Sequence, residues 1–207
     1  MPPVRPIFSA AAVLGATALG SPTLRTARLL LRPFAAADAA RLSELAGAFE
    51  IADTMISIPH PYPLQLAVDW IAGRGQASQL AHAVRFAITE EASAQLAGCV
   101  ELRDLDAEHA QGELSFWIGK PFWGRGYAAE AGTAVLQFGF ESLDLNRIYA
   151  FHMVRNPASG KVLHNLGLQR EGILRQRVRR WGRFEDVVAC AILRTEFRAN
   201  PRYRAYA

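Results

Sequence analysis

The segment that decides the fold is Phe116-Trp-Ile-Gly-Lys-Pro-Phe-Trp-Gly-Arg-Gly-Tyr-Ala-Ala-Glu-Ala131. Its pattern predicts a short strand, then a loop with Gly124 and Gly126, then the start of a helix. Glycines let the backbone come close to a ligand, and free amides from Gly124 to Ala128 at a helix N-terminus bind anions. Arg125 adds a positive charge to the loop. A pyrophosphate group is therefore the expected ligand.

A tight turn is the alternative interpretation of these two glycines, and an isolated Gly-x-Gly would favour it. The segment also lacks the spacing of two common phosphate-binding motifs. It has neither the Gly-x-Gly-x-x-Gly of a dinucleotide-binding fold nor the Gly-Lys-Ser/Thr of a P-loop. The spacing therefore argues against both of those classes.

Strand-like and helix-like segments alternate on both sides of this loop. The expected strands cover residues 29–32, 84–89, 97–102, 113–118, 147–153, 172–180 and 186–193, and the expected helices cover 36–45, 64–79, 128–143 and 157–166. Three prolines make residues 58–63 irregular. The chain has 207 residues, 51% of them hydrophobic, and no linker-like stretch interrupts it, so one domain is expected. The predicted fold class is α/β, of the α+β kind with a mixed sheet, in the order β-α-α-β-β-β-α-β-α-β-β.

The positive charge is concentrated near the C-terminus. The net charge is +4, and all basic residues except Lys120 and Lys161 are arginine. Residues 170–207 hold ten arginines against four acidic residues, so this segment carries +6 and the remainder −2. Arginine favours bidentate contacts with phosphate or carboxylate groups, although a GC-rich coding sequence produces the same excess. Cys99 and Cys190 predict reduced, buried thiols in a cytosolic protein, and the five scattered histidines predict no metal site.

The N-terminal residues 1–21 are expected to be an extension outside the domain. Residues 7–20 form an apolar stretch that resembles the central region of a signal peptide, but no clear cleavage site precedes Ser21. The stretch is too short and too rich in Ala and Gly to span a bilayer as a helix. An additional helix or an upstream start codon is favoured over export.

The segment Pro-Phe-Trp-Gly-Arg-Gly-Tyr-Ala-Ala-Glu-Ala resembles the acetyl-CoA signature of the Gcn5-related N-acetyltransferases, specifically the RimJ/RimL-like branch. Three further segments agree in order and separation: Leu24 to Arg32 as the opening strand, Asn156-Pro-Ala-Ser159 after a strand, and Leu166 to Gly172 before the last hairpin. The resemblance covers residues 22–197, which implies an acetyltransferase domain of that extent and a basic tail at 198–207.

This resemblance implies an acyl-CoA site between two splayed strands, 113–119 and 147–153. Backbone groups near Trp117 hold the cofactor and polarise the thioester carbonyl, as an oxyanion site does, and the loop from Trp123 to Tyr127 binds the pyrophosphate. Asn156 binds the pantetheine arm or a water. The implied cofactor set is Trp117, Ile118, Gly119, Trp123, Gly124, Arg125, Gly126, Tyr127, Ala128, Asn156 and Ser159.

The residues that would move protons depart from the pattern of the family. Phe151 stands where relatives often have a glutamate base, Leu163 where many have a proton-donating tyrosine, and Val178 where a RimL-type carboxylate is expected. Ser159 suits the stabilisation of the leaving thiolate, although a serine near a helix start is also a common capping residue. The catalytic residues predicted are therefore Ser159 and Glu113.

Glu113 is the best remaining carboxylate, because strand alternation places it on one face with Ser115 and Trp117. Deprotonation of the amine through a water held by Glu113 or His152 is the working hypothesis. An ordinary polar residue at a strand edge is the alternative for each of the two.

The resemblance also implies that the acceptor lies between the loop around His60 and Tyr62 and the hairpin 175–183. Asp186 either orders this hairpin or contacts substrate, so the predicted substrate-binding residues are His60, Tyr62 and Asp186. The arginines of the hairpin attract an acidic peptide or ribosomal surface, or they lie on a solvated strand face, which is the favoured interpretation. Trp181 is expected to be an aromatic residue of the turn.

Taken together, the sequence predicts a cytoplasmic N-acetyltransferase that transfers the acetyl group of acetyl-CoA to a primary amine. The acceptor is a peptide N-terminus or a small molecule, and neither a metal nor a membrane takes part. A non-catalytic acyl-CoA-binding module, or a protein that docks on RNA or the ribosome, is the alternative. RNA binding is disfavoured because few aromatic residues accompany the C-terminal arginines. The chain is expected to be a monomer or a homodimer.

Overall fold

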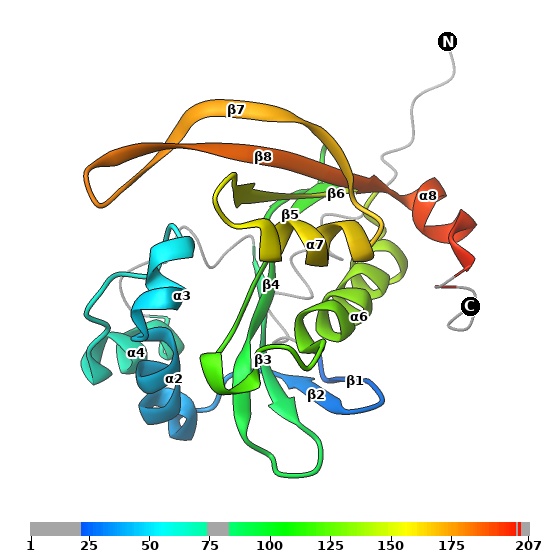
Figure 1. The fold of residues 1–207 in the computed structure, drawn as a ribbon. Helices are drawn as coiled ribbons and strands as arrows, with labels where there is room; N and C mark the ends of the chain where they lie inside the picture. Colours follow the sequence, from blue (N-terminus) through cyan, green and yellow to red (C-terminus); the bar gives the residue numbers. More distant parts are fainter. Residues whose placement is uncertain (1–21, 74–82, 202, 204–207) are drawn as a thin grey trace.

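The computed structural model describes residues 22–73, 83–201 and 203. Eight strands form one sheet in the order β1-β2-β3-β4-β5-β6-β8-β7 (Figure 1). Only β5 and β6 are parallel, and all other neighbours are antiparallel. The strands are β1 Leu24–Arg25, β2 Leu29–Arg32, β3 Val84–Glu90, β4 Leu96–Asp106, β5 Gln111–Ile118, β6 Arg147–Met153, β7 Gln169–Arg180 and β8 Arg183–Leu193.

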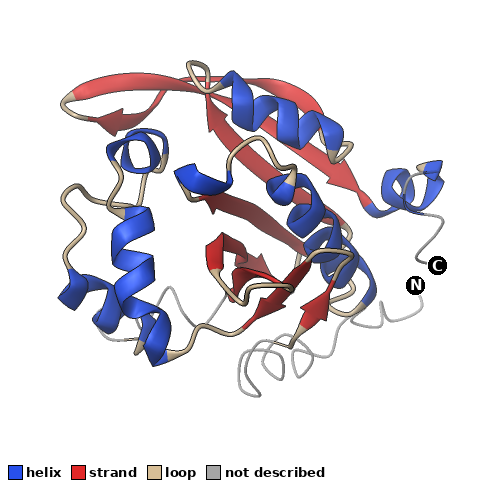
Figure 2. Cartoon of the chain, turned by 60° about the horizontal axis from the view of Figure 1, so that its bottom comes forward, coloured by secondary structure: helices blue, strands red, loops and turns tan. Residues whose placement is uncertain are grey.

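Helices cover the sheet from both sides (Figure 2). They are η1 Ala36–Asp38, α2 Ala39–Ala46, α3 Phe49–Thr54, α4 Leu64–Ile71, η2 Lys120–Phe122, α6 Tyr127–Glu141, α7 Pro157–Asn165 and α8 Arg194–Ala199. Leu45 of α2 packs against Gly119 at the end of β5, so closely that a Cβ there would lie 2.7 Å from it. On the other face of the sheet, Gly139 of α6 packs against Ile148 of β6. No helix in the described ranges is long and apolar enough to cross a bilayer.

The core lies between α6 and the middle strands. Phe86 of β3 is fully buried and meets Phe138 of α6 edge to face, with ring centroids 5.8 Å apart. Alternating apolar residues explain this packing, because each strand presents one side to α6 and the other to α2 and α4. Cys99 and Cys190 are buried and unpaired, as expected, and burial raises the pKa of both thiols.

The ladder between β5 and β6 is short, and this feature positions the functional site. The two strands pair only from Gln111 to Glu113 on β5 and from Arg147 to Tyr149 on β6. Beyond these three pairs the strands diverge, and β6 pairs with β8 on its other side along its whole length. The sheet is therefore open in its middle, between the second half of β5 and that of β6.

The predicted fold class is confirmed, and the mixed sheet has the expected chain order. Three of the described helices were not expected: α3 lies ahead of the proline-rich segment, the short η2 follows β5, and α8 follows the last strand. Helix α4 ends at Ile71, short of the expected 64–79, and residues 74–82 lie outside the described residues. The N-terminal residues 1–21 are likewise outside them, and the domain boundaries remain predictions.

Candidate active site

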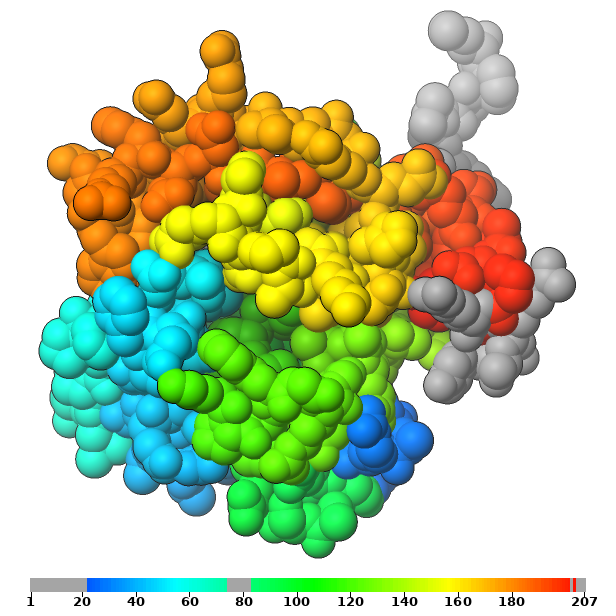
Figure 3. All heavy atoms as spheres, in the orientation of Figure 1, coloured from blue at the N-terminus to red at the C-terminus, as the bar shows by residue number. Residues whose placement is uncertain are grey.

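A cavity of about 620 Å³ occupies the opening between β5 and β6. Figure 3 shows it as a hollow among α3, α7 and the loop after β5. Its lining includes Gly124, Gly126 and the first turn of α6, together with Glu50, Thr54 and their neighbours on α3. The mostly apolar lining with a few polar groups is typical of a ligand site.

The backbone of β5 turns half of its polar groups toward this cavity. The amide of Gly119 donates to Ala97 O at 2.8 Å, so the residues with odd numbers on β5 bond to β4. Because backbone direction alternates along a strand, the N–H and C=O groups of Phe116 and Ile118 point to the opening. The indole of Trp123 donates to Ile118 O at 2.5 Å and occupies one of these groups. The remainder can bind a ligand that carries amides.

The glycine loop before α6 has the conformation of an anion site. Gly124 and Gly126 have φ of 75° and 79°, a region that disfavours residues with a Cβ. Helix α6 begins at Tyr127 and spans 15 residues, so its first amides and its dipole face the cavity at this loop. A Cβ at Gly124 would meet nothing within 4 Å, so the loop is open to a ligand.

Arg125 is held in place within this loop. Its Nη1 donates to Glu90 Oε1 at 2.9 Å and its Nη2 to Pro121 O at 3.1 Å. The hydroxyl of Tyr127 donates to the same Glu90 oxygen at 2.7 Å. This hydrogen bond, followed by that of Ser93 and the charge of Arg125, lowers the pKa of Glu90. Glu90 thus fixes Arg125 beside the helix start.

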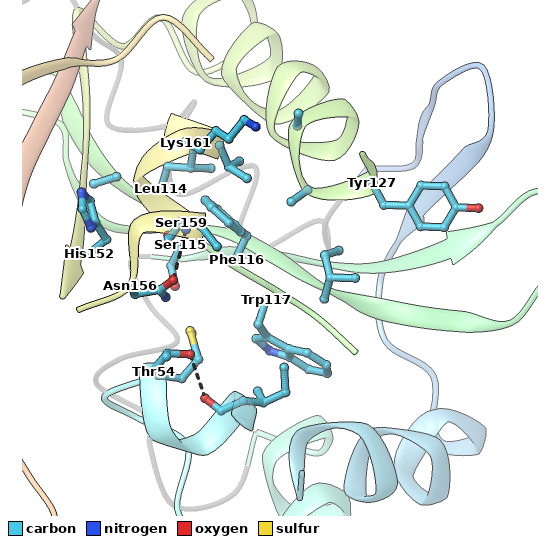
Figure 4. Close-up of a pocket in the computed structure, with 18 of the residues that line it drawn as sticks. Thr54, Leu114, Ser115, Phe116, Trp117, Tyr127, His152, Asn156, Ser159 and Lys161 are labelled. Atoms are coloured by element: carbon cyan, nitrogen blue, oxygen red, sulfur yellow. Dashed lines mark hydrogen bonds between the residues drawn. The ribbon is translucent and has the colours of Figure 1, made fainter. Parts of the chain in front are cut away.

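Arg28 lies beside the glycine loop and Lys161 lines the cavity, and the sequence analysis singled out neither for the site. A Cβ at Gly126 would lie 3.6 Å from Nη2 of Arg28, whose guanidinium also stacks 5.0 Å from the ring centroid of Tyr127. Glu130 holds Arg28 there through its Nε at 2.8 Å. Lys161 lines the cavity from α7 (Figure 4). Only the folded chain brings Arg28 to the loop, since about one hundred residues separate them.

Asn156 and Ser159 both line the cavity from the start of α7, and the structure separates their roles. Asn156 is the residue that caps the helix, because its Oδ1 accepts from the amide of Ser159 at 3.2 Å (Figure 4). Ser159 lies three residues inside, so its hydroxyl is not the helix cap. The capping interpretation of Ser159 was therefore wrong, and the cap is Asn156.

Glu113 and Ser115 are among the few buried polar residues of the described chain, at 8% and 9% exposure. Both line the cavity, and strand alternation puts them on one face with Trp117, as expected. Arg103, which lies opposite Glu113 on β4, donates to its Oε1 through Nη2. Burial nevertheless raises the pKa of Glu113 above its ordinary value, against the lowering effect of Arg103. A carboxylate with a raised pKa is suited to accept a proton.

His152, the second candidate base, lines the same cavity from β6. Its Nδ1 lies 2.9 Å from Met153 O, and a carbonyl only accepts, so Nδ1 carries the hydrogen. The basic nitrogen of the neutral ring is therefore Nε2. Phe151, which the resemblance aligns with a frequent glutamate base, lines the cavity, and Leu163 is buried in the core at 1% exposure.

The three predicted acceptor residues are not together. Tyr62 lines a second, smaller cavity, and burial raises its pKa to about 12. His60 is exposed, and its Nδ1 lies 3.0 Å from Gly47 O. Asp186 accepts from the amide of Gln176 at 2.7 Å within the terminal hairpin. Tyr62 thus lines a cavity beside the first one, while Asp186 orders the hairpin.

The tip of the β7–β8 hairpin docks on α3. Arg180 donates to the carbonyls of Ala52 and Ile58, the latter at 2.5 Å, and the Trp181 indole donates to Asp53 Oδ1 at 2.7 Å. Arg180 is thus not part of a solvated face, which corrects the favoured interpretation for this residue. Arg177 and Arg179 are exposed, as that interpretation expected.

A family model described as the acetyltransferase (GNAT) domain matches residues 28–169. The chain belongs to the GNAT acetyltransferase family. This GNAT protein is 33% identical to p20 of Bacillus licheniformis, named an uncharacterized N-acetyltransferase, over 84% of this chain and 98% of p20. It is 29% identical to a spermidine N(1)-acetyltransferase of Vibrio cholerae, over 56% of this chain and 67% of that protein.

Solved structures of GNAT proteins share the fold. An acetyltransferase of this family from Bacillus anthracis superposes with a TM-score of 0.74 at 22% identity, over 84% of this chain and 99% of that one. The spermidine N-acetyltransferase from Vibrio cholerae in complex with CoA and spermine gives 0.72 at 23% identity, over 83% and 99%. The predicted resemblance to Gcn5-related N-acetyltransferases is confirmed, and so is the prediction of an acetyl-CoA-dependent N-acetyltransferase.

Proposed function

We propose that this GNAT protein transfers the acetyl group of acetyl-CoA to the primary amine of a small molecule or a peptide N-terminus. One observation carries the proposal. The opening between β5 and β6 joins an anion site of backbone amides at one end to the buried carboxylate of Glu113 further in. A phosphate-bearing acyl donor and a proton acceptor therefore share one cavity.

The residues that would hold acetyl-CoA fit its chemistry. The amides from Gly124 to Ala128, with Arg28 and Arg125 beside them, bind the pyrophosphate at the start of α6. The free backbone groups of β5 at Phe116 and Ile118 bind the amide-bearing pantetheine arm as an adjacent strand would. When bound, acetyl-CoA supplies the thioester that the amine attacks.

Side chains that line the cavity would accept the proton of the amine and stabilise the charges that develop during the reaction. Glu113, through one water, removes a proton from the attacking ammonium or amine, and Arg103 keeps the carboxylate oriented. The backbone amides of β5 stabilise the negative oxygen of the tetrahedral intermediate. The hydroxyl of Ser159 donates to the departing thiolate sulfur. His152 is the second candidate for the base, since its Nε2 is free to accept.

The finer assignments belong to the same proposal. The four ordered motifs support the RimJ/RimL-like branch, and the reduced, buried cysteines support a cytoplasmic location. A monomer or homodimer remains the expectation. The spermidine acetyltransferase among the relatives supports an amine acceptor, without choosing between a polyamine and another amine.

Binding of acetyl-CoA is the first test. A ligand that binds only the folded state at 100 times its Kd adds about 2.7 kcal/mol to the free energy of unfolding, which raises Tm by several degrees. We expect acetyl-CoA to raise Tm. Acetylated pantetheine compounds that lack the phosphate groups should leave Tm unchanged, because they cannot use the pyrophosphate site. An unchanged Tm at millimolar acetyl-CoA would contradict the proposal.

The pH dependence of Glu113→Gln tests the base. A base must be deprotonated to act, so kcat/KM of the wild type should fall as pH drops through the pKa of Glu113. Because burial raises that pKa, the acid limb should lie above pH 4.5, the ordinary value for Glu. We expect Glu113→Gln to lose this limb and about 100-fold or more in kcat. An unchanged profile in Glu113→Gln, with the limb lost in His152→Asn, would assign the base to His152.

A further inference from the structure

Ser115 is a buried serine of β5 that lies where two cavities meet. It is 9% exposed, and its side chain is on the same face of the strand as those of Glu113 and Trp117. It lines the large cavity (Figure 4) and also a second cavity of about 210 Å³ on the side of α2 and α4. The ladder to β6 ends at Glu113, so Ser115 is the first residue on this face that borders the opening in the sheet.

The hydroxyl of Ser115 lacks a hydrogen-bond partner among the described residues. The three other buried polar side chains of that part of the chain, those of Asp38, Thr89 and Glu113, each have a partner there. A buried hydroxyl without a partner costs about 1–3 kcal/mol. Since Ser115 lines two cavities, water or a ligand in one of them is the expected partner.

Glu113 has a free acceptor atom on the same face of β5. Arg103 donates to its Oε1, and no described residue donates to its Oε2. Alternate residues of a strand are about 6.7 Å apart, and a water hydrogen-bonds to each of two oxygens at about 2.8 Å. One water can therefore bridge Glu113 Oε2 and the hydroxyl of Ser115.

The second cavity gives water access to this position. Arg85, Glu101, Arg103 and Asp104 line it, and a polar cavity of this size holds water. Glu101 lies opposite Ser115 in the ladder between β4 and β5, but both of its oxygens face a guanidinium. Its Oε2 accepts from Arg85 at 2.8 Å, and its Oε1 lies 3.6 Å from Arg103 Nη1. Glu101 is thus already paired and does not compete for the bridging water.

The groups around Glu113 leave it suited to take up a proton. Burial raises its pKa, and the charges of Asp104 and Glu101 on β4 act in the same direction, against the lowering effect of Arg103. Tyr149 of β6 lies opposite Glu113 in the ladder, and burial, followed by the charge of Glu113, raises the pKa of this phenol. Tyr149 therefore stays neutral and does not replace Glu113 as the base.

We propose that Ser115 holds the water through which Glu113 deprotonates the acceptor amine. The water donates one hydrogen bond to Ser115 Oγ and one to Glu113 Oε2, and its oxygen faces the ammonium group. One N–H bond breaks as its proton passes to the water, and one O–H bond of the water breaks as that proton passes to Glu113. The amine keeps the electron pair with which it attacks the thioester. Ser115 gains and loses no proton, so it is a positioning residue. This inference rests on the proposed acetyl transfer.

A double-mutant cycle tests this role. Thiol release from acetyl-CoA is measured with the fastest acceptor among peptides with a free N-terminus, spermidine and free amino acids. We expect Ser115→Ala to lower kcat about 10-fold through the lost hydrogen bond, with KM for acetyl-CoA unchanged. Ser115→Thr keeps a hydroxyl and should recover most of the rate. Wild-type kcat in Ser115→Ala would overturn the inference.

The second arm of the cycle separates positioning from a merely structural effect. In a Glu113→Gln background, Ser115→Ala should cause no further loss of kcat, because the two residues act as one unit. Losses that multiply would overturn the inference. Thr133→Val is the matched control: Thr133 donates to Ala129 O at 2.9 Å on α6 and is not among the residues that line the large cavity. It should leave kcat unchanged.

A high-resolution crystal structure tests the inference without turnover. We expect one ordered water at about 2.8 Å from both Ser115 Oγ and Glu113 Oε2 in the wild type, and its loss in Ser115→Ala. A wild-type structure without this water would overturn the inference.

The two proposals fail in different ways. If acetyl transfer itself is wrong, acetyl-CoA does not raise Tm and no acceptor releases thiol. If only the role of Ser115 is wrong, acetyl-CoA still raises Tm and thiol is released, while Ser115→Ala keeps the wild-type kcat or its loss multiplies with that of Glu113→Gln.

Discussion

Gly126 adopts a φ of 79° at the residue before α6, where several functions meet. Its carbonyl accepts from Glu130, its amide belongs to the proposed pyrophosphate site, and Arg28 lies beside it. A side chain here would strain the backbone and tilt the amides that follow. A single residue thus couples backbone conformation to anion binding.

We expect Gly126→Ala to weaken acetyl-CoA binding by about 10-fold or more. The left-handed conformation costs about 1–2 kcal/mol for a residue with a Cβ, and relief of that strain reorients the loop. Calorimetric titration with acetyl-CoA measures the affinity. Gly182→Ala is the matched control, because Gly182 also has a φ of 79° and open surroundings, but lies in the hairpin turn. If Gly126→Ala bound acetyl-CoA as tightly as Gly182→Ala and the wild type do, the result would count against the proposed pyrophosphate site.

At this scale the sequence predicted the backbone conformation of the loop well and the partners of the charged residues poorly. The proposed roles of Gly124, Gly126 and Asn156 depend on the local backbone conformation. The residues next to them in sequence determine that conformation, so they were enough to predict a site. The positions of Arg28 and Arg103 depend on which residues lie opposite them in the folded sheet. A single sequence does not reveal that pairing. Arg180 was misassigned for the same reason, since its partners are carbonyls more than one hundred residues away.

Among the elements, the β7–β8 hairpin and α3 are joined by several side-chain contacts. The ring of Trp181 stacks on Phe49 with centroids 5.6 Å apart, while Arg155 bridges Asp53 of α3 and Glu185 of β8. Helix α3 is only six residues long, and such a helix is not stable alone. The hairpin therefore holds in place the helix that forms the inner wall of the cavity.

Trp181→Ala should destabilise the fold and weaken acceptor binding. Loss of the stacking and of the indole hydrogen bond to Asp53 should cost about 1–3 kcal/mol in the free energy of unfolding. We expect KM for the acceptor to rise several-fold while kcat and the affinity for acetyl-CoA change little, as steady-state kinetics would show. Phe184→Ala is the control, because Phe184 lies on the same hairpin and is 63% exposed. If both variants keep the wild-type KM, the hairpin does not position α3.

The length of an element decided whether the spacing of its apolar residues could predict it. The pattern predicted seven strands and α6 at the right places, although β4 extends four residues beyond the expected 97–102 and β7 and β8 each begin three residues early. Helix α3 spans fewer than two turns, so Phe49–Thr54 offers no repeat of apolar residues to detect. Its helical state comes from contacts with the hairpin, which lie far away in sequence.

Across the whole molecule, the C-terminal segment fastens the two helices that border the cavity. Tyr203 is 6% exposed, its ring stacks on Phe197 at 4.2 Å, and its hydroxyl donates to Leu166 O at 2.8 Å. Leu166 in turn packs on α6, where a Cβ at Gly132 would lie 2.6 Å from it. Phe197 and Tyr203 thus stabilise the junction of α6 and α7.

Substitutions of Tyr203 should separate its packing from its hydrogen bond. Tyr203→Ala should lower the free energy of unfolding by about 3 kcal/mol, because a buried aromatic side chain leaves a cavity. Tyr203→Phe keeps the stacking and should cost about 1 kcal/mol for the lost hydrogen bond. Urea denaturation measures both. Equal losses in the two variants would show that the ring contributes nothing to stability.

The short ladder between β5 and β6 amounts to a free edge in the interior of a sheet. Exposed edges pair with passing polypeptides and cause aggregation, so proteins usually shield them. In this GNAT protein α6 and α7 pack beside the two diverging strands, and the open edge of β5 lines the cavity of about 620 Å³. A cavity of this size has no room for a second sheet, but it has room for an extended amide-bearing molecule. The open edge of β5, which would be a site of aggregation on an exposed sheet, is thus the proposed binding surface for the ligand.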